Sequence, residues 1–190
     1  MNDNLINLKG IETVYSFSKN KKKGIPPVEK WDPPFCGDID IHILRNGKWM
    51  YMGSEIKRPA MIKLFSNILR LDEDGFYYLV TPVEKVRIKV DDAPFVAIAM
   101  QKYSDNGVEN LEFITNVQDQ IILSKEHPIE IVIKENNEPS PYITVRKNLK
   151  ALISRSVYYE LIDIADQEVI NNKKYLILKS NNSIFKIYEI

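Results

Sequence analysis

One nine-residue pattern occurs twice in this chain and limits the fold more than any other feature. Residues 58–66 read RPAMIKLFS, and residues 146–154 read RKNLKALIS. Each copy begins with arginine, ends with serine and carries apolar residues between them at helix-like spacing. A pattern that returns at a fixed offset predicts an internal duplication. Two related halves packed together would also create a crevice, and crevices between domains favour small ligands.

Composition narrows the class of protein. The 190 residues suit two small halves that share an apolar junction. The 26 basic and 26 acidic residues argue against duplex nucleic acid as the main partner, since phosphate binding needs a basic excess. The single cysteine excludes an intrachain disulfide. No signal peptide and no apolar run of about 20 residues is evident, so we expect a cytoplasmic protein without a membrane span.

Local patterns divide the chain into an arm and two halves. We expect an N-terminal helix and a Lys/Pro-rich arm over residues 1–27, a first α+β repeat over 28–103 and a second over 104–190. Alternating isoleucines from Ile39 predict a strand, and Asn46-Gly47 predicts a type I′ hairpin turn. The overall expectation is an α+β fold whose β-rich halves each pack on one long helix.

The two helices of this expectation coincide with the repeated pattern. In the first half Ser54 can cap a helix that carries Arg58 and Pro59 in its first turn. In the second half we expect a helix from about Arg146 to Leu161, and then a closing hairpin across residues 181 and 182.

A thiol and two carboxylates gather at the start of the first predicted strand. Asp38 and Asp40 lie on one face of that strand, opposite the isoleucines, and Cys36 stands just before them. Two carboxylates can hold a divalent cation or act as acid and base, but they also suit a solvated polar face. Cys36 has no recognisable histidine partner, so a buried, unreactive thiol is the alternative to a nucleophile.

The helix starts also suggest an anion site. Ser54 and Arg58 could bind a phosphate or carboxylate together with free backbone N–H groups, and Arg146 would be the equivalent arginine of the second half. Structural ion pairs are the alternative for both arginines. The ends of strands add further polar groups that would form either a binding rim or ordinary turns. These groups are Thr81, Glu84 and Lys85 in the first half and Asn116 in the second.

Several longer motifs resemble one family. They are residues 31–40 (WDPPFCGDID), 49–59 (WMYMGSEIKRP), 64–66 (LFS), 79–85 (LVTPVEK) and 91–95 (DDAPF). Together they resemble the bacterial family called domain of unknown function 1285, from about residue 25 to 190. The resemblance implies a duplicated α+β core with a pleckstrin-homology-like C-terminal half. It also implies a signalling role with a nucleotide-like ligand near the junction, and no shared catalytic activity.

Three functions remain open on the sequence alone. The first is a regulatory protein in signal transduction that binds a small anionic or nucleotide-like ligand at the junction of its halves. The second is a protein-interaction module that docks a partner segment on an edge strand. The third is a metal-dependent hydrolase or phosphotransferase that uses Asp38 and Asp40. We predict no cofactor and favour a protein that is not an enzyme.

Overall fold

The computed structural model describes residues 10, 12, 14–16, 24–133 and 138–190. Their contacts group the chain into two compact units, unit 1 over Met1–Asp91 and unit 2 over Asp92–Ile190. The predicted N-terminal helix is described only in part: residues 12 and 14–16 are helical, and residues 1–9, 11, 13 and 17–23 lie outside the described residues. The lysine run at residues 21–23 also lies outside them.

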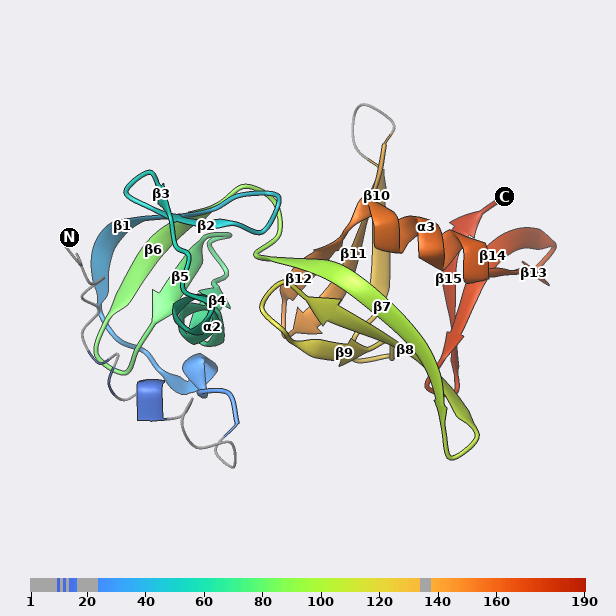
Figure 1. Ribbon diagram of the computed structural model, residues 1–190, viewed down its shortest axis with the longest axis horizontal. Coiled ribbons are helices and arrows are strands. Elements are labelled where there is room, and N and C mark those ends of the chain that lie inside the picture. Colours follow the sequence, from blue (N-terminus) through green and yellow to red (C-terminus); the bar gives the residue numbers. More distant parts are fainter. Residues whose placement is uncertain (1–9, 11, 13, 17–23, 134–137) are drawn as a thin grey trace. The chain divides into compact units, whose positions relative to one another are not determined.

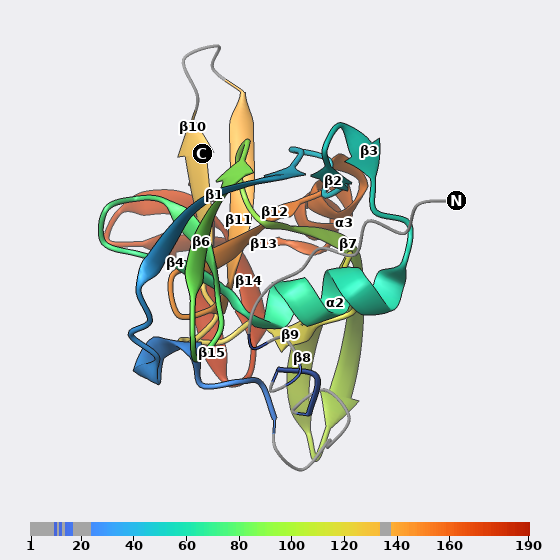
Figure 2. The ribbon, with the colours of Figure 1, turned by 90° about the vertical axis from the view of Figure 1, so that its left-hand side faces the viewer.

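Unit 1 contains one six-stranded sheet. Its strands are β1 (Phe35–Ile43), β2 (Trp49–Tyr51), β3 (Ser54–Glu55), β4 (Leu69–Leu71), β5 (Tyr77–Val80) and β6 (Lys85–Val90). The order across the sheet is β3-β2-β1-β6-β5-β4. The central strands β1 and β6 run parallel and lie side by side (Figure 2), whereas the other neighbours are antiparallel.

The alternation predicted for β1 is confirmed. Ile41 and Ile43 are buried, and Asp38 and Asp40 are exposed on the opposite face. The hairpin after β1 is also confirmed, but the predicted turn type is wrong. Only Gly47 has positive φ, whereas a type I′ turn needs positive φ at both central residues.

Helix α2 (Pro59–Asn67) packs on the apolar face of this sheet through Phe65, whose ring stacks on Trp49 with centroids 6.4 Å apart. The predicted helix is confirmed, and proline stands in its first turn, where the missing N–H is tolerated. Its predicted cap is wrong. Arg58 is the residue before the helix, whereas Ser54 lies in β3 and pairs with Tyr51.

The proline-rich arm is held on unit 1 by one arginine. A short 3-10 helix, η2 (Val28–Lys30), precedes β1. Arg70 in β4 donates hydrogen bonds from Nη1 to the carbonyl oxygens of Val28 and Trp31, at 2.9 and 2.8 Å. The segment that joins the arm to β1 therefore has defined backbone partners in β4.

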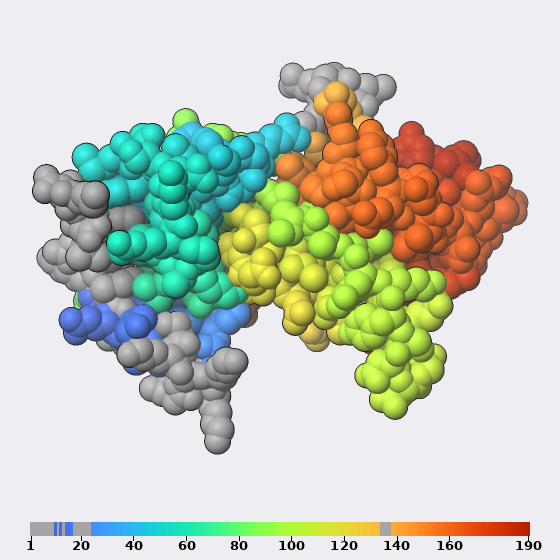
Figure 3. Space-filling model, in the orientation of Figure 1, coloured from blue at the N-terminus to red at the C-terminus, as the bar shows by residue number. Residues whose placement is uncertain are grey.

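The described part of unit 2 contains two sheets and one helix (Figure 1). The helix is α3 (Arg155–Ile164), and the strands are β7 (Phe95–Asp105), β8 (Val108–Thr115), β9 (Gln120–Ile122), β10 (Ile129–Ile133), β11 (Pro139–Arg146), β12 (Leu149–Ile153), β13 (Asp166–Ile170), β14 (Lys173–Ser180) and β15 (Ser183–Glu189). The sheet orders are β10-β11-β12-β7-β8-β9 and β13-β14-β15. The far ends of β7 and β8 protrude as a two-stranded ribbon (Figure 3).

The second copy of the repeated pattern is not a helix. Residues 146–154 form the end of β11, a turn with positive φ at Lys147, and β12. Leu149, Ala151 and Ile153 are buried while the residues between them are less so, which is the period of a strand. Pairing with β11 on one side and β7 on the other selects this reading over a helix. The helix begins at Arg155, and Ser154 caps it by accepting a hydrogen bond from the N–H of Val157.

The overall class is β-rich with two six-stranded sheets, in agreement with an α+β fold. The helices α2 and α3 are short, with 9 and 10 residues. The expected limit at residue 103 falls inside β7, whereas the compact units divide after Asp91. Within the described parts of the chain, no helix combines the length and apolar composition needed to cross a membrane.

Candidate functional site

A cleft of about 440 Å³ opens in unit 1, in the size range of ligand pockets. It lies between β1, β6 and the turn that precedes β5. Its lining residues are Asp38, Ile39, Gly75, Phe76, Tyr77, Arg87, Ile88, Lys89 and Val90.

An irregularity in strand pairing coincides with this cleft. Asp38 pairs with Arg87 and His42 pairs with Lys89, so four steps along β1 correspond to two steps along β6. The extra residues bulge out of β1, since a regular parallel ladder advances equally on both strands. Bulges of this kind are enriched next to functional sites because they change the direction of side chains.

Arg87 is held in the cleft by a carboxylate and an aromatic ring. Its Nε and Nη2 donate to the two carboxylate oxygens of Asp38, at 2.7 and 2.8 Å. Its guanidinium also lies over the ring of Phe76, 4.8 Å from the centroid. The hydrogen bond from Arg87 holds the pKa of Asp38 below its usual value, and the same bond raises the pKa of Arg87.

Lys89 supplies a second positive charge on the same face. It lies two residues after Arg87 in β6, so both side chains point to one side of the sheet. Lys89 is exposed, and its ammonium group makes no hydrogen bond or ion pair with the residues that the structure describes. The nearby Asp91 is hydrogen-bonded to His42, Nε2 to Oδ1 at 2.6 Å. That bond, more than the charge of Lys89, lowers the pKa of Asp91.

A tight turn places Phe76 at the rim of the cleft. Asp74 accepts hydrogen bonds from the N–H of Phe76 at 3.0 Å and from the hydroxyl of Tyr78 at 2.7 Å. Gly75 has φ +80°, a conformation that favours glycine. The turn fixes Phe76 with about half of its side chain exposed.

Two family models cover most of the chain. The "Domain of unknown function (DUF1285), N-terminal domain" matches residues 26–93, and the "Protein of unknown function (DUF1285), C-terminal domain" matches residues 94–187. The chain belongs to the DUF1285 family. The resemblance inferred from the sequence motifs is therefore confirmed.

Two solved DUF1285 structures are similar to this chain. The one from Silicibacter pomeroyi DSS-3 is 41% identical, with a TM-score of 0.79 and 97% of each chain covered. The one from Shewanella baltica OS155 is 27% identical, with a TM-score of 0.52 over 65% of this chain and 90% of that one. No curated protein matches.

The other predicted residues of the first half lie in different surroundings from the cleft of this DUF1285 chain. Thr81 is buried, and its hydroxyl accepts hydrogen bonds from the N–H groups of Val83 and Glu84, so it closes a turn. Glu84 is buried in the same turn. Lys85 bonds to Asp72 at 2.8 Å.

The thiol and the second carboxylate lie on β1 but do not line the cleft. Cys36 is exposed, where the sequence also allowed a buried thiol, and its Sγ contacts the carbonyl oxygen of Pro34 at 3.5 Å. Asp40 is exposed and lies within the irregular stretch between Asp38 and His42. Among the described residues, no three side chains of histidine, cysteine, aspartate or glutamate gather closely enough to hold a metal ion. Both oxygens of Asp38 are bonded to Arg87, whereas Asp40 does not line the cleft.

The two predicted arginines belong to different units. Arg58 is exposed before α2 in unit 1. Arg146 lies in unit 2, where it pairs with Asp119 at 3.3 Å and its guanidinium lies over the ring of Phe95. Asn116 is structural, because its side chain accepts from the N–H of Val96 at 3.0 Å while its own N–H donates to the carbonyl of Val96.

Sequence reasoning missed Phe76, Arg87 and Lys89. One signal was present, because residues 85–90 read KVRIKV and so place three cations on one face of a strand. The pairing of that strand with β1 was not visible in the sequence, because parallel neighbours lie far apart along the chain. The cleft depends on this pairing.

Proposed function

We propose that this protein binds a small anionic, nucleotide-like ligand in the cleft of unit 1. One observation carries the proposal: the ammonium group of Lys89, which has no hydrogen bond or ion pair to the described residues, belongs with Arg87 to the lining of a cleft of about 440 Å³. Guanidinium and ammonium groups are the side chains that bind phosphate best. A regulatory role in signal transduction, implied by the family resemblance, forms part of the proposal.

Phe76 gives the cleft a surface for a planar group. About half of its side chain is exposed, and an exposed aromatic ring at the rim suits stacking or edge contacts. A ligand with a phosphate near Arg87 and Lys89 and a planar ring near Phe76 would use both kinds of surface. This combination describes a nucleotide-like molecule.

The test is calorimetric titration of the full chain with a panel of mononucleotides and with inorganic phosphate. Arg87→Ala and Lys89→Ala should each weaken binding, whereas Lys48→Ala should not, because Lys48 bonds to Glu55 outside the cleft. Arg58→Ala should leave binding unchanged if the ligand lies in the cleft, and should weaken binding if the site uses Arg58. Loss of binding in Arg58→Ala together with unchanged binding in Arg87→Ala would contradict the cleft.

The pleckstrin-homology likeness of the C-terminal half is a second part of the proposal, and it concerns protein partners. In unit 2 the outer strand β13 pairs with β14, its only neighbour in the described sheet, and Val169 on it is exposed. A strand of this kind can accept a partner segment by β-augmentation. The test is amide hydrogen exchange on a complex of the full chain with a co-purified protein partner. New protection of the β13 amides would support this docking, and unchanged exchange of those amides would refute it.

A further inference from the structure

The ion pair between Asp38 and Arg87 affects which anions can bind in the cleft. This inference rests on the function proposed above. Both oxygens of Asp38 are bonded to Arg87, and the Phe76 ring lies against the same guanidinium. The Nε and Nη2 donors with which Arg87 would bind an anion are therefore already bonded to a carboxylate of the protein itself.

A ligand carboxylate that displaces Asp38 from Arg87 would gain little binding free energy. A ligand monocarboxylate would form the same two hydrogen bonds with Arg87 that Asp38 gives up. The exchange leaves the number of ion pairs unchanged, and ordering the ligand has an entropic cost. A monocarboxylate is therefore a poor competitor at this site.

A phosphate monoester differs in charge and shape. It carries close to two negative charges at neutral pH and has three terminal oxygens, so it can bond to Arg87 and Lys89 at once. Lys89 lies two residues from Arg87 on the same face, within reach of one phosphate group. The second cation gives the phosphate an interaction that Asp38 does not supply.

The ion pair between Asp38 and Arg87 can also open at a small cost in free energy. Its side chain is 62% exposed and that of Arg87 36%, so water solvates the carboxylate when the pair opens. The pairing of β1 with β6 is irregular on both sides of Asp38, between Phe35 and Asp38 and between Asp38 and His42.

We propose that Asp38 is a specificity-determining residue, which occupies Arg87 in the unliganded protein and yields to a dianionic phosphate monoester that engages Arg87 and Lys89 together. The carboxylate thus excludes monoanions from a cleft that they would otherwise enter. This is selection by competition within the site.

The experiment compares phenyl phosphate with benzoate, two probes that share the ring and differ in the anionic group. Calorimetry on the full chain should give binding of phenyl phosphate about tenfold tighter than that of benzoate, the factor expected from one further charge-assisted hydrogen bond. Asp38→Asn should tighten the binding of both probes, and that of benzoate more. The ratio of the two affinities, phenyl phosphate over benzoate, therefore falls. Lys89→Met should weaken phenyl phosphate and leave benzoate unchanged.

Asp40→Asn is the matched control, since Asp40 lies on the same face of β1 and does not line the cleft. It should reproduce the wild-type ratio, and the melting temperature of each variant shows that it is folded. Equal ratios in wild type and Asp38→Asn overturn the role of Asp38 and leave anion binding in place. Absence of heat with both probes, in wild type and in Asp38→Asn, overturns the proposed function and this inference with it.

Discussion

Asp72 joins two cations on the polar face of unit 1. Its carboxylate accepts from Arg70 and from Lys85, and Arg70 also holds the arm. Desolvation alone would raise the pKa of Asp72, but the hydrogen bonds from Arg70 and Lys85 outweigh it, so the pKa is lowered. A carboxyl with a lowered folded-state pKa contributes stability above its unfolded pKa, and that contribution is lost as the pH falls through the folded value.

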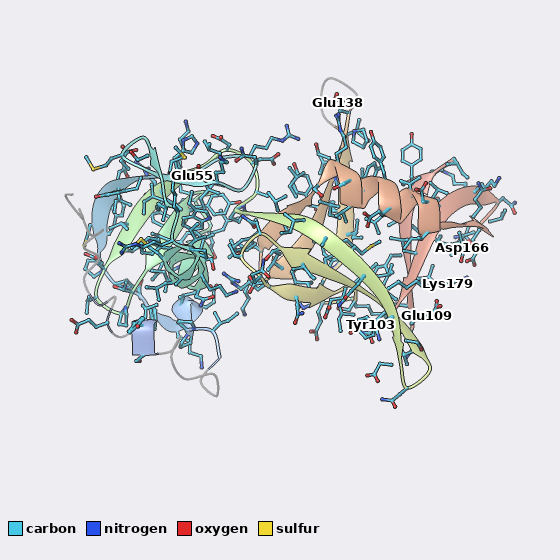
Figure 4. All side chains as sticks on the ribbon, in the orientation of Figure 1. Glu55, Tyr103, Glu109, Glu138, Asp166 and Lys179 are labelled. Carbon is cyan, nitrogen blue, oxygen red and sulfur yellow. The ribbon has the colours of Figure 1, made fainter. Side chains whose placement is uncertain are left out.

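Asp72→Ala should lower the free energy of unfolding by about 2 kcal/mol, less than for a fully buried pair, because the side chains here are partly exposed. Urea denaturation at pH 7 measures the loss. Asp166→Ala is the control: it removes an exposed partner of Lys179 in unit 2 (Figure 4) and should leave the midpoint unchanged. A similar loss in both variants would contradict the structural role of Asp72.

Tyr78 provides a titration that reports on the rim of the cleft. The hydrogen bond to Asp74 raises the pKa of Tyr78 to about 12. Because the folded value exceeds the unfolded value of about 10, this stabilisation is present below pH 10 and is lost as the pH rises toward 12. Asp74→Asn should move the pKa of Tyr78 downward.

The titration is followed by the ultraviolet absorbance of tyrosinate. Tyr78→Phe identifies the component that belongs to Tyr78. A high-pH component that remains in Asp74→Asn but disappears in Tyr78→Phe would show that Asp74 is not its cause.

The exposed face of β1 shows how far residue-level prediction reaches. Alternation placed Asp38 and Asp40 outside and the isoleucines inside, and the structure confirms it. The bidentate bond to Arg87 was not predictable, because it depends on which distant strand pairs with β1. Spacing along the chain defines the face of a side chain, and the neighbouring strand defines its partner.

At the scale of elements, turns were predicted better than the choice between helix and strand. The hairpin across Asn181 and Asn182 is confirmed, with Ser180 paired to Ser183 and positive φ at both asparagines. Residues 146–154 are predicted as a helix because their apolar spacing is helix-like, but pairing of β12 with the flanking strands β11 and β7 makes them a strand pair.

This hairpin is also anchored to β8. The hydroxyl of Ser180 accepts from the N–H of Leu111 at 3.0 Å, and the N–H of Asn181 donates to the carbonyl of Glu109 at 2.8 Å. The turn therefore connects the two sheets of unit 2. A change in its backbone should affect the stability of the whole unit.

Asn182→Val should lower the free energy of unfolding by about 1–2 kcal/mol, because a β-branched residue is strained at φ +54°. Asn182→Gly adopts this conformation freely and should keep the wild-type midpoint. Thermal unfolding followed by circular dichroism compares the variants. Equal losses for valine and glycine would show that the asparagine side chain matters more than the backbone conformation.

At the scale of the whole molecule, all described strand pairings remain within one unit. The sheet of unit 1 ends with β6, and the sheets of unit 2 begin with β7. Each unit also has its own buried apolar residues, such as Trp49 in unit 1 and Phe113 in unit 2. The sequence predicted a division into two β-rich parts, but the repeated pattern on which that prediction began is a helix in one part and a strand pair in the other.

Residues 92–190 produced alone should therefore fold. We expect a dispersed amide spectrum and a single cooperative unfolding transition, since no described strand of this unit pairs with a strand of unit 1. A collapsed, poorly dispersed spectrum would show that unit 2 depends on unit 1 for its stability.

The parallel pairing of β1 with β6 sets the order of events during synthesis. Strand β1 is the first of its sheet to leave the ribosome and β6 is the last, so β1 must wait for its parallel neighbour until residue 90 has been translated. Contacts of such long sequence separation also slow folding. The cleft, which requires both strands, is therefore among the last parts of unit 1 to form on a nascent chain.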